Sequence, residues 1–209
     1  MPVKKNRTLE NLCIALTDIK AAFDSTPNTS LVASLRCLGI PNIIVRLIDY
    51  SQTQRKVVIR TAYGLTDPYT PPAGVEQGGT HSPWLWLAFY DALLLALDTY
   101  TTGITLDADS WRPGTPGTVP SIRLTNVTVA DDLTLIATTR EDLEEQFKLT
   151  MEFLNIHHTQ LSGAKTSIGI NKPRLTIADT RPLVLNADTH SPSLNSLIST
   201  MYSALLVHR

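Results

Sequence analysis

The 209-residue sequence lacks an apolar run long enough to cross a membrane. Its longest such run, residues 84–97, is 14 residues long and contains Asp91, whereas a spanning helix needs about 20 apolar residues. Cysteine is also scarce: Cys13 and Cys37 are the two in the sequence, and both lie in apolar surroundings. We therefore expect no membrane span, and we expect reduced core thiols without a disulfide partner, as in an intracellular protein.

The sequence also lacks an excess of charge of either sign, with 18 basic and 19 acidic side chains. With 43% hydrophobic and 18% charged residues, it has the composition of a globular domain and not of a disordered chain. The balance conceals an asymmetry, because residues 61–160 carry 4 basic against 13 acidic side chains. Part of this acidity, at residues 141–145, is typical of a solvated helix face. Asp131 and Asp132 need another explanation, since they lie between apolar stretches.

The pattern of apolar residues predicts strands and helices in mixed order. Residues 12–17 form a continuous apolar run, which predicts a buried strand ending at Asp18. The elements expected after it are helices near 28–38 and 41–51, a weak strand at 56–62, a largely buried helix at 82–100, strands at 122–129 and 133–138, a helix at about 139–158, and a short strand at 165–170. This order predicts an α+β fold in which helices pack on one face of a small antiparallel sheet.

Local signals indicate how these elements begin. Ser25-Thr26-Pro27 and Ser82-Pro83 each place a capping hydroxyl before a proline, which is typical of a helix start. Residues 138–141 match a capping box, and the proline-rich residues 107–120 predict a surface excursion.

Two acidic positions suggest chemistry. Asp18 ends one predicted strand, and Asp131 lies at the tip of a predicted hairpin 113 positions later. If these strands are neighbours, the carboxylates converge at one edge of the sheet and repel each other unless cations neutralise them. Mg²⁺ prefers one or two carboxylates together with substrate phosphates. Such a site suits two-metal nucleotidyl transfer, in which the ions lie about 3.5–4 Å apart.

Four segments resemble the palm motifs of reverse transcriptases, in the order and approximate spacing of the non-LTR (LINE-like) retrotransposon enzymes. They cover about residues 10–171 and are Asp18-Ile19-Lys20-Ala21-Ala22-Phe23-Asp24, residues 74–86 with Gln77-Gly78 and Ser82-Pro83, Val129-Ala130-Asp131-Asp132, and Gly163-Ala164-Lys165-Thr166. The resemblance implies a polymerase palm that acts as an RNA-directed DNA polymerase, with an RNA template, a DNA primer and deoxynucleoside triphosphates as partners.

The resemblance also implies roles for single residues. Asp18 and Asp131 would be the principal ligands of two Mg²⁺ ions, or of Mn²⁺, and Asp132 would support them. Lys165 would protonate the departing pyrophosphate or balance its charge. Phe23 would lie under the sugar of the incoming nucleotide and exclude a 2′-hydroxyl group. The two remaining residues with implied roles, which would contact the nucleotide and the template, are Gln77 and Gly78.

Each of these residues also has a purely structural interpretation. Asp131-Asp132 is compatible with an ordinary acidic turn, Phe23 with a core aromatic, and Lys165 with a solvated surface side chain. We interpret Asp24 as a hydrogen-bonding residue at a helix entry and not as a third ligand. The remaining interpretations are Ser82 as a helix cap and His157 and His158 as surface residues without a metal-binding partner at suitable spacing.

The sequence departs from the family in length. The resemblance implies a fingers region before the first motif and a thumb after the last, whereas 17 residues precede Asp18. We expect a palm at residues 1–171 with the fingers largely absent, a C-terminal extension at 172–209 that is either a partial thumb or poorly ordered, and little activity alone. The alternative is a non-catalytic retrotransposon remnant or interaction module that retains the palm fold. An RNA-dependent RNA polymerase is disfavoured by Phe23 and Ala130.

Overall fold

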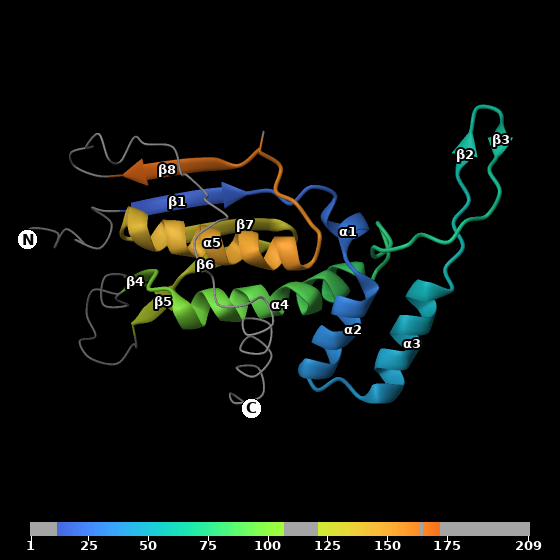
Figure 1. The fold of residues 1–209 in the computed structure, drawn as a ribbon, viewed down its shortest axis with the longest axis horizontal. Helices are drawn as coiled ribbons and strands as arrows, with labels where there is room; N and C mark the ends of the chain where they lie inside the picture. The colour runs from blue at the N-terminus through green and yellow to red at the C-terminus, as the bar shows by residue number, and fades with distance from the viewer. Residues whose placement is uncertain (1–11, 107–120, 164, 172–209) are drawn as a thin grey trace, which may run out of the picture.

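The computed structural model of the protein describes residues 12–106, 121–163 and 165–171 (Figure 1). The predicted surface excursion at 107–120 and the predicted C-terminal extension at 172–209 lie outside these residues.

A four-stranded antiparallel sheet forms the centre of the fold, with the strand order β6-β7-β1-β8 (Figure 1). Its strands are β1 (Leu12–Thr17), β6 (Asn126–Val129), β7 (Asp132–Ala137) and β8 (Ser167–Asn171). Side chains alternate between the two faces of β1, so that Cys13 and Ala15 are buried while Leu16 is exposed. The predicted strand at 12–17 and its neighbouring hairpin strand are both confirmed.

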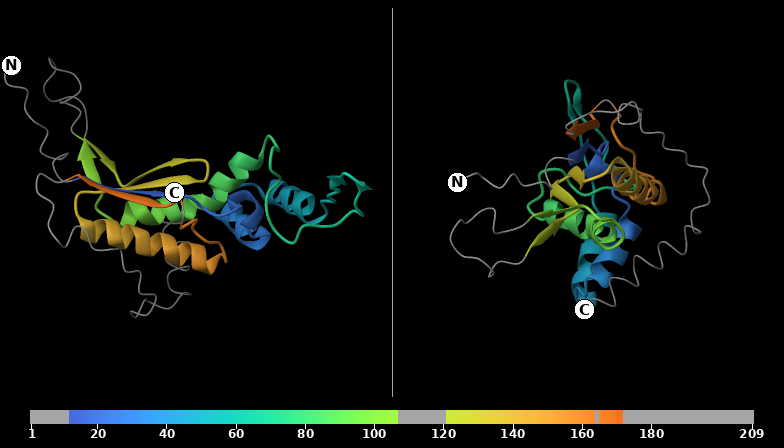
Figure 2. Two further views of the ribbon diagram at one scale, coloured as in Figure 1. Left: turned by 90° about the horizontal axis from the view of Figure 1, so that it is seen from above. Right: turned by 90° about the vertical axis from the view of Figure 1, so that its left-hand side faces the viewer.

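Two helices, α4 (Ser82–Tyr100) and α5 (Arg140–Ile156), pack on one face of this sheet (Figure 2). The other three, α1 (Ala22–Ser25), α2 (Asn28–Cys37) and α3 (Asn42–Thr53), lie beyond the end of the sheet at which β1 finishes (Figure 1). The largest buried side chains come from α4 and α5 and include Trp86, Phe89, Tyr90 and Phe153. None of the helices in the described part of the chain has the length and apolar character needed to cross a membrane. The arrangement confirms the predicted α+β fold with helices on one face.

Two small hairpin ladders lie outside the central sheet. One pairs β2 (Arg60–Thr61) with β3 (Gly64–Leu65) and projects away from the body of the molecule (Figure 1). The other pairs β4 (Ile104–Leu106) with β5 (Ile122–Leu124). The sequence predicted one strand over 122–129, but the chain divides at the buried Thr125, whose hydroxyl hydrogen-bonds the Asp98 carboxylate. Residues 122–124 and 126–129 therefore pair with different partners.

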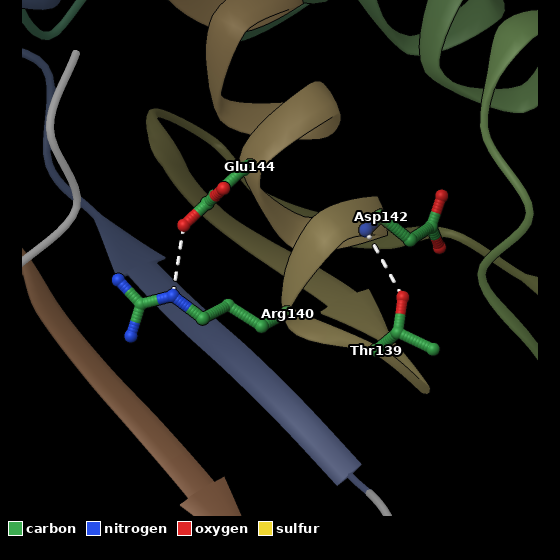
Figure 3. Close-up of polar contacts among 4 residues, drawn as sticks. All are labelled: Thr139, Arg140, Asp142 and Glu144. Carbon is green, nitrogen blue, oxygen red and sulfur yellow. Dashed lines mark hydrogen bonds and ion pairs between the residues drawn. The ribbon is translucent and has the colours of Figure 1, made fainter. Parts of the chain in front are cut away.

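The capping predictions were wrong in detail. At the start of α5, Thr139 and not Thr138 is the cap: the Asp142 backbone N–H donates to the Thr139 hydroxyl at 3.1 Å (Figure 3). In the same turn, Arg140 Nε lies 2.8 Å from Glu144 Oε1, an ion pair at helical spacing (Figure 3).

The two predicted serine and threonine caps before prolines do not form either. Ser82 is the first residue of α4, and its buried hydroxyl has no hydrogen-bond partner among the described residues. The Thr26 hydroxyl donates back to the Ala22 carbonyl at 3.1 Å, so it closes α1 instead of opening α2.

His157 was predicted to lie on the surface, and this was wrong. Its ring packs edge-on against Phe153 and Phe89, with centroids 4.5 and 4.9 Å apart, and its Nδ1 lies 2.9 Å from the Ser30 hydroxyl. Burial, with a smaller contribution from the neighbouring His158, lowers the pKa of His157 to about 4. His158 itself is exposed, as predicted.

The depressed pKa of His157 predicts a pH-dependent stability. Its unfolded pKa is about 6.5, so protonation favours the unfolded chain. The stability that the neutral ring contributes is therefore present above about pH 6.5 and is lost as the pH falls toward the folded value of about 4. We expect the urea midpoint of the wild type to fall more between pH 7 and pH 5 than that of His157→Gln. His158→Gln is the control: it removes only the smaller of the two contributions to the lowered pKa of His157, so its slope should stay close to that of the wild type. Parallel curves for all three proteins would contradict the prediction.

Candidate active site

The candidate site lies at the end of the central sheet where the two inner strands meet, β1 at its C-terminal end and β7 at its N-terminal end; this end is called the sheet edge below. Thr17, the last residue of β1, pairs with Leu133, and its hydroxyl donates to the Leu133 carbonyl at 2.9 Å. Continuing this register by one residue places Asp18 opposite Asp132, the first residue of β7. Two acidic residues that are 114 positions apart in the sequence therefore flank each other at one sheet edge.

Asp131 lies in the turn between β6 and β7. Val129 pairs with Asp132, so Ala130 and Asp131 form the two-residue connection of a hairpin, as the sequence predicts. Ala130 has a φ of 55°, which the tight hairpin turns require at their first central position and which glycine adopts most easily. A side-chain-bearing residue there costs about 1–2 kcal/mol. The turn that presents Asp131 is therefore held in a conformation that the rest of the fold must stabilise.

Lys165 reaches the same edge from the segment before β8. Its ammonium nitrogen lies 3.2 Å from Asp18 Oδ1, while the Ser162 backbone N–H donates to the Asp18 carbonyl at 2.8 Å. The Lys165 side chain is 70% exposed, and an ion pair of this kind contributes only about 0–1 kcal/mol to stability. The pair therefore adds little to the stability of the fold.

Backbone hydrogen bonds attach the second motif to the first. The Val75 N–H donates to the Phe23 carbonyl and the Gly74 N–H donates to the Thr26 carbonyl, each at 2.8 Å. Gly74 has a φ of +93°, and a Cβ there would lie 2.6 Å from the Asp24 carbonyl oxygen. Glycine is therefore required at this contact.

The other residues of these motifs take different positions. Phe23 is half-buried and stacks on Trp86, with ring centroids 5.8 Å apart and 29° between the planes. Gln77 and Gly78 are exposed, and Gly78 has a φ of +87° with nothing within 4 Å of a Cβ built there. Glycine is therefore favoured at position 78 by its positive φ, and not by crowding, since neighbouring atoms leave room for a Cβ. Asp24 lies in α1 with an exposed side chain.

The donor chemistry at this edge fits a divalent cation. Carboxylate oxygens are the ligands that Mg²⁺ prefers, and Mg²⁺ usually takes one or two of them together with water and substrate phosphates. Within residues 12–106, 121–163 and 165–171, no group of three His, Cys, Asp or Glu side chains is placed to hold a metal ion. The residues present thus fit a cation whose coordination is completed by oxygen atoms from water and substrate.

Sequence reasoning missed two aromatic residues beneath this site. The Trp86 Nε1–H donates to the Ala130 carbonyl at 2.9 Å. Tyr90 lies one turn further along α4, and burial together with the negative charge of Asp131 raises the pKa of its hydroxyl. The signal that could have found them was their spacing of four residues in the apolar helix that follows the second motif.

The family described as "Reverse transcriptase (RNA-dependent DNA polymerase)" matches residues 3–190. The Pol polyprotein of the type-2 retrotransposable element R2DM from Drosophila melanogaster is 27% identical over 186 residues, which are 87% of this chain and 16% of that protein. The type-1 R2 polyprotein of Nasonia vitripennis is 31% identical over 140 residues, 65% of this chain and 12% of that protein.

Solved structures support the fold. Telomerase from Candida tropicalis in complex with a fragment of telomeric RNA superposes with a TM-score of 0.57 at 15% identity, over 82% of this chain and 28% of that one. The apo enzyme truncated from its C-terminal domain gives the same score over 83% of this chain and 33% of that one. The chain spans only 12–16% of these two curated relatives. It belongs to the reverse transcriptase family, and its similarity to R2 elements identifies it as a domain of the non-LTR retrotransposon type.

Proposed function

We propose that the chain is the palm of an RNA-directed DNA polymerase, which joins deoxynucleotides to a primer 3′-hydroxyl group. One observation carries this proposal: the register of β1 and β7 brings Asp18 and Asp132 to the sheet edge where the Ala130–Asp131 turn also lies. Family membership supports the same activity. The description of the family as an RNA-dependent DNA polymerase supports an RNA template.

In this proposal Asp18, Asp131 and Asp132 would each supply a carboxylate to one or both of two divalent cations, with Mg²⁺ as the expected ion, and water and substrate phosphates would complete the coordination. When bound, the cations stabilise the attacking and leaving oxygens of an in-line phosphoryl transfer. Lys165, whose ammonium nitrogen is 3.2 Å from Asp18, donates a proton to the departing pyrophosphate or balances its charge. Gln77 and Gly78 are exposed at the surface of the second motif, where nucleotide and template can reach them.

The test is primer extension on an RNA template with deoxynucleoside triphosphates, comparing Mg²⁺, Mn²⁺ and a metal-free reaction. Incorporation that depends on a divalent cation and on the RNA template supports the proposal. The absence of any incorporation with either cation counts against it.

Phe23 predicts the choice of sugar. If its ring lies under the incoming nucleotide, Phe23→Ala opens space for a 2′-hydroxyl group and lowers the preference for deoxynucleotides by about 10-fold or more, since a contact of this size in a pocket discriminates by about 10–200-fold. The ratio of kcat/KM for matched deoxy- and ribonucleotides measures the effect. Phe23→Tyr keeps the ring and is the matched control. An unchanged ratio in the alanine variant would leave Phe23 as a core aromatic stacked on Trp86.

A non-catalytic palm is the second candidate, and the ion pair between Lys165 and Asp18 favours it, because the ammonium group lies against a proposed ligand. Metal binding separates the two functions. Mn²⁺ binding measured by electron paramagnetic resonance should be saturable and weakened by Asp18→Asn if the palm is catalytic. A non-catalytic palm should bind Mn²⁺ no better than the Asp18→Asn variant does.

A further inference from the structure

Trp86 contacts both parts of the proposed site, the first motif at Phe23 and the turn at Ala130 and Asp131. It lies in the second turn of α4, is fully buried, and contacts the first motif on one side and the catalytic turn on the other. Its ring stacks on Phe23, with centroids 5.8 Å apart, and its indole N–H donates to the Ala130 carbonyl at 2.9 Å. A single rigid side chain therefore spans the distance between the proposed sugar contact and the proposed metal-binding turn.

The position of Trp86 is itself fixed from several directions. Tyr90 stacks on the ring at 5.2 Å with 28° between the planes, and Phe89 packs against it at 5.5 Å. An indole offers one hydrogen-bond donor and no acceptor, so the direction of the bond to Ala130 is unambiguous. Because the ring cannot turn within this stack, the N–H group points at one place on the turn.

The turn needs such a support. Ala130 has a φ of 55°, and residues with a Cβ rarely adopt this region. Apart from the bond from Trp86, the hydrogen bonds described around the Ala130–Asp131 turn are those of the β6–β7 ladder. The hydrogen bond from Trp86 is made to the carbonyl group that directly precedes Asp131. It therefore restrains the orientation of the peptide group that joins Ala130 to Asp131.

We propose that Trp86 is a positioning residue that holds the Ala130–Asp131 turn at a fixed place relative to Phe23. The proposed metal-binding carboxylate of Asp131 and the sugar of the nucleotide would then stay at a fixed distance from each other. The proposal rests on the proposed function for its catalytic consequence. Trp86 contacts neither substrate nor cation; it acts through Ala130 and Phe23. A phenylalanine at this position could fill the space but could not make the hydrogen bond.

The first test is Trp86→Phe, which keeps an aromatic ring and removes the N–H donor. Trp84→Phe is the matched control, since Trp84 lies two residues earlier in α4 with its side chain 74% exposed. Loss of a group that orients a metal ligand typically lowers metal affinity or activity by about 10–100-fold. We expect a loss of that size in kcat for Trp86→Phe, with the KM for the deoxynucleotide changed less than about 3-fold, and wild-type kinetics for Trp84→Phe. A lower melting temperature with unchanged kcat and metal affinity would overturn the proposal and make Trp86 a packing residue.

The second test does not depend on polymerase activity. The protein has three tryptophans, so its ¹⁵N-labelled indole signals can be assigned with the two variants. The Trp86 indole N–H should exchange with solvent at least about 10-fold more slowly than that of Trp84, because it is buried and hydrogen-bonded. Added Mn²⁺ should broaden the Trp86 signal before the Trp84 signal, and Trp86→Phe should bind Mn²⁺ about 10-fold more weakly than Trp84→Phe.

These readouts separate the two proposals. If the wild type does not extend a primer but the Mn²⁺ results hold, the positioning role stands and the polymerase proposal fails. If the Trp86 and Trp84 indole N–H groups exchange at the same rate, or if both variants bind Mn²⁺ equally, the positioning role fails whatever the activity.

Discussion

Asp131→Asn is expected to abolish primer extension while leaving the protein folded. Asparagine has the same shape as aspartate but no negative charge, and it offers a cation one neutral oxygen in place of a carboxylate. Removing one preorganised hydrogen-bond donor at a developing charge costs about 10²–10³-fold in kcat. If Asp131 is a ligand to the proposed cations, on which both reacting oxygens would depend, its loss should cost at least as much. The measurement is single-turnover extension at saturating Mg²⁺.

The control for this variant is Glu145→Gln, which removes an acidic charge from the exposed face of α5. Its activity should equal that of the wild type, which separates a ligand effect from a change in overall charge. If Asp131→Asn keeps an activity within about 10-fold of the wild type, the proposed role of Asp131 is contradicted. Such a loss is smaller than the loss of kcat caused by removing a single hydrogen-bond donor from an active site. Circular dichroism of both variants confirms that they are folded.

Phe153→Ala is expected to cause the largest loss of stability. Phe153 is 2% exposed and packs against Phe89, Tyr90 and His157, with ring centroids 5.3, 5.9 and 4.5 Å away. Truncating a buried phenylalanine costs about 3–5 kcal/mol, out of a total of about 5–15 kcal/mol for a typical domain. For a protein of this size the melting temperature should fall by about 6–20 °C.

Tyr63→Ala is the matched control for that loss. Tyr63 lies between β2 and β3 on the projecting hairpin, fully exposed, so its truncation should change the free energy of unfolding by less than about 0.5 kcal/mol. Urea denaturation measures both variants. A Phe153→Ala midpoint equal to that of Tyr63→Ala would show that the aromatic cluster of α4 and α5 does not support the fold.

The sequence predicts well those elements whose apolar pattern is decided locally. The run at residues 12–17 corresponds to β1, and the apolar segment at 82–100 corresponds to α4. The hairpin that carries Asp131 could also be predicted, because strand-forming residues flank a short acidic break. The sequence left open whether the strand before Asp18 and this hairpin are neighbours, and the pairing of β1 with β7 shows that they are.

What could not be predicted depends on contacts between distant residues. His157 looks polar in the sequence, but Phe89, Phe153 and Ser30 surround it only after α2, α4 and α5 have packed. The division at Thr125 likewise depends on Asp98, 27 positions earlier. Trp86 could be predicted as a core residue of a buried helix, but its hydrogen bond to Ala130 joins residues 44 positions apart and leaves no local pattern.

The small ladder of β4 and β5 has a consequence for how this domain can vary between relatives. Leu106 and Ile122 are paired with each other, so these two residues are held at adjacent points in the fold. The entropic cost of closing such a loop grows slowly, by about 0.6 kcal/mol for each doubling of its length. Insertions between these two residues are therefore expected to cost little stability and to leave the turn at Ala130 and Asp131 in place.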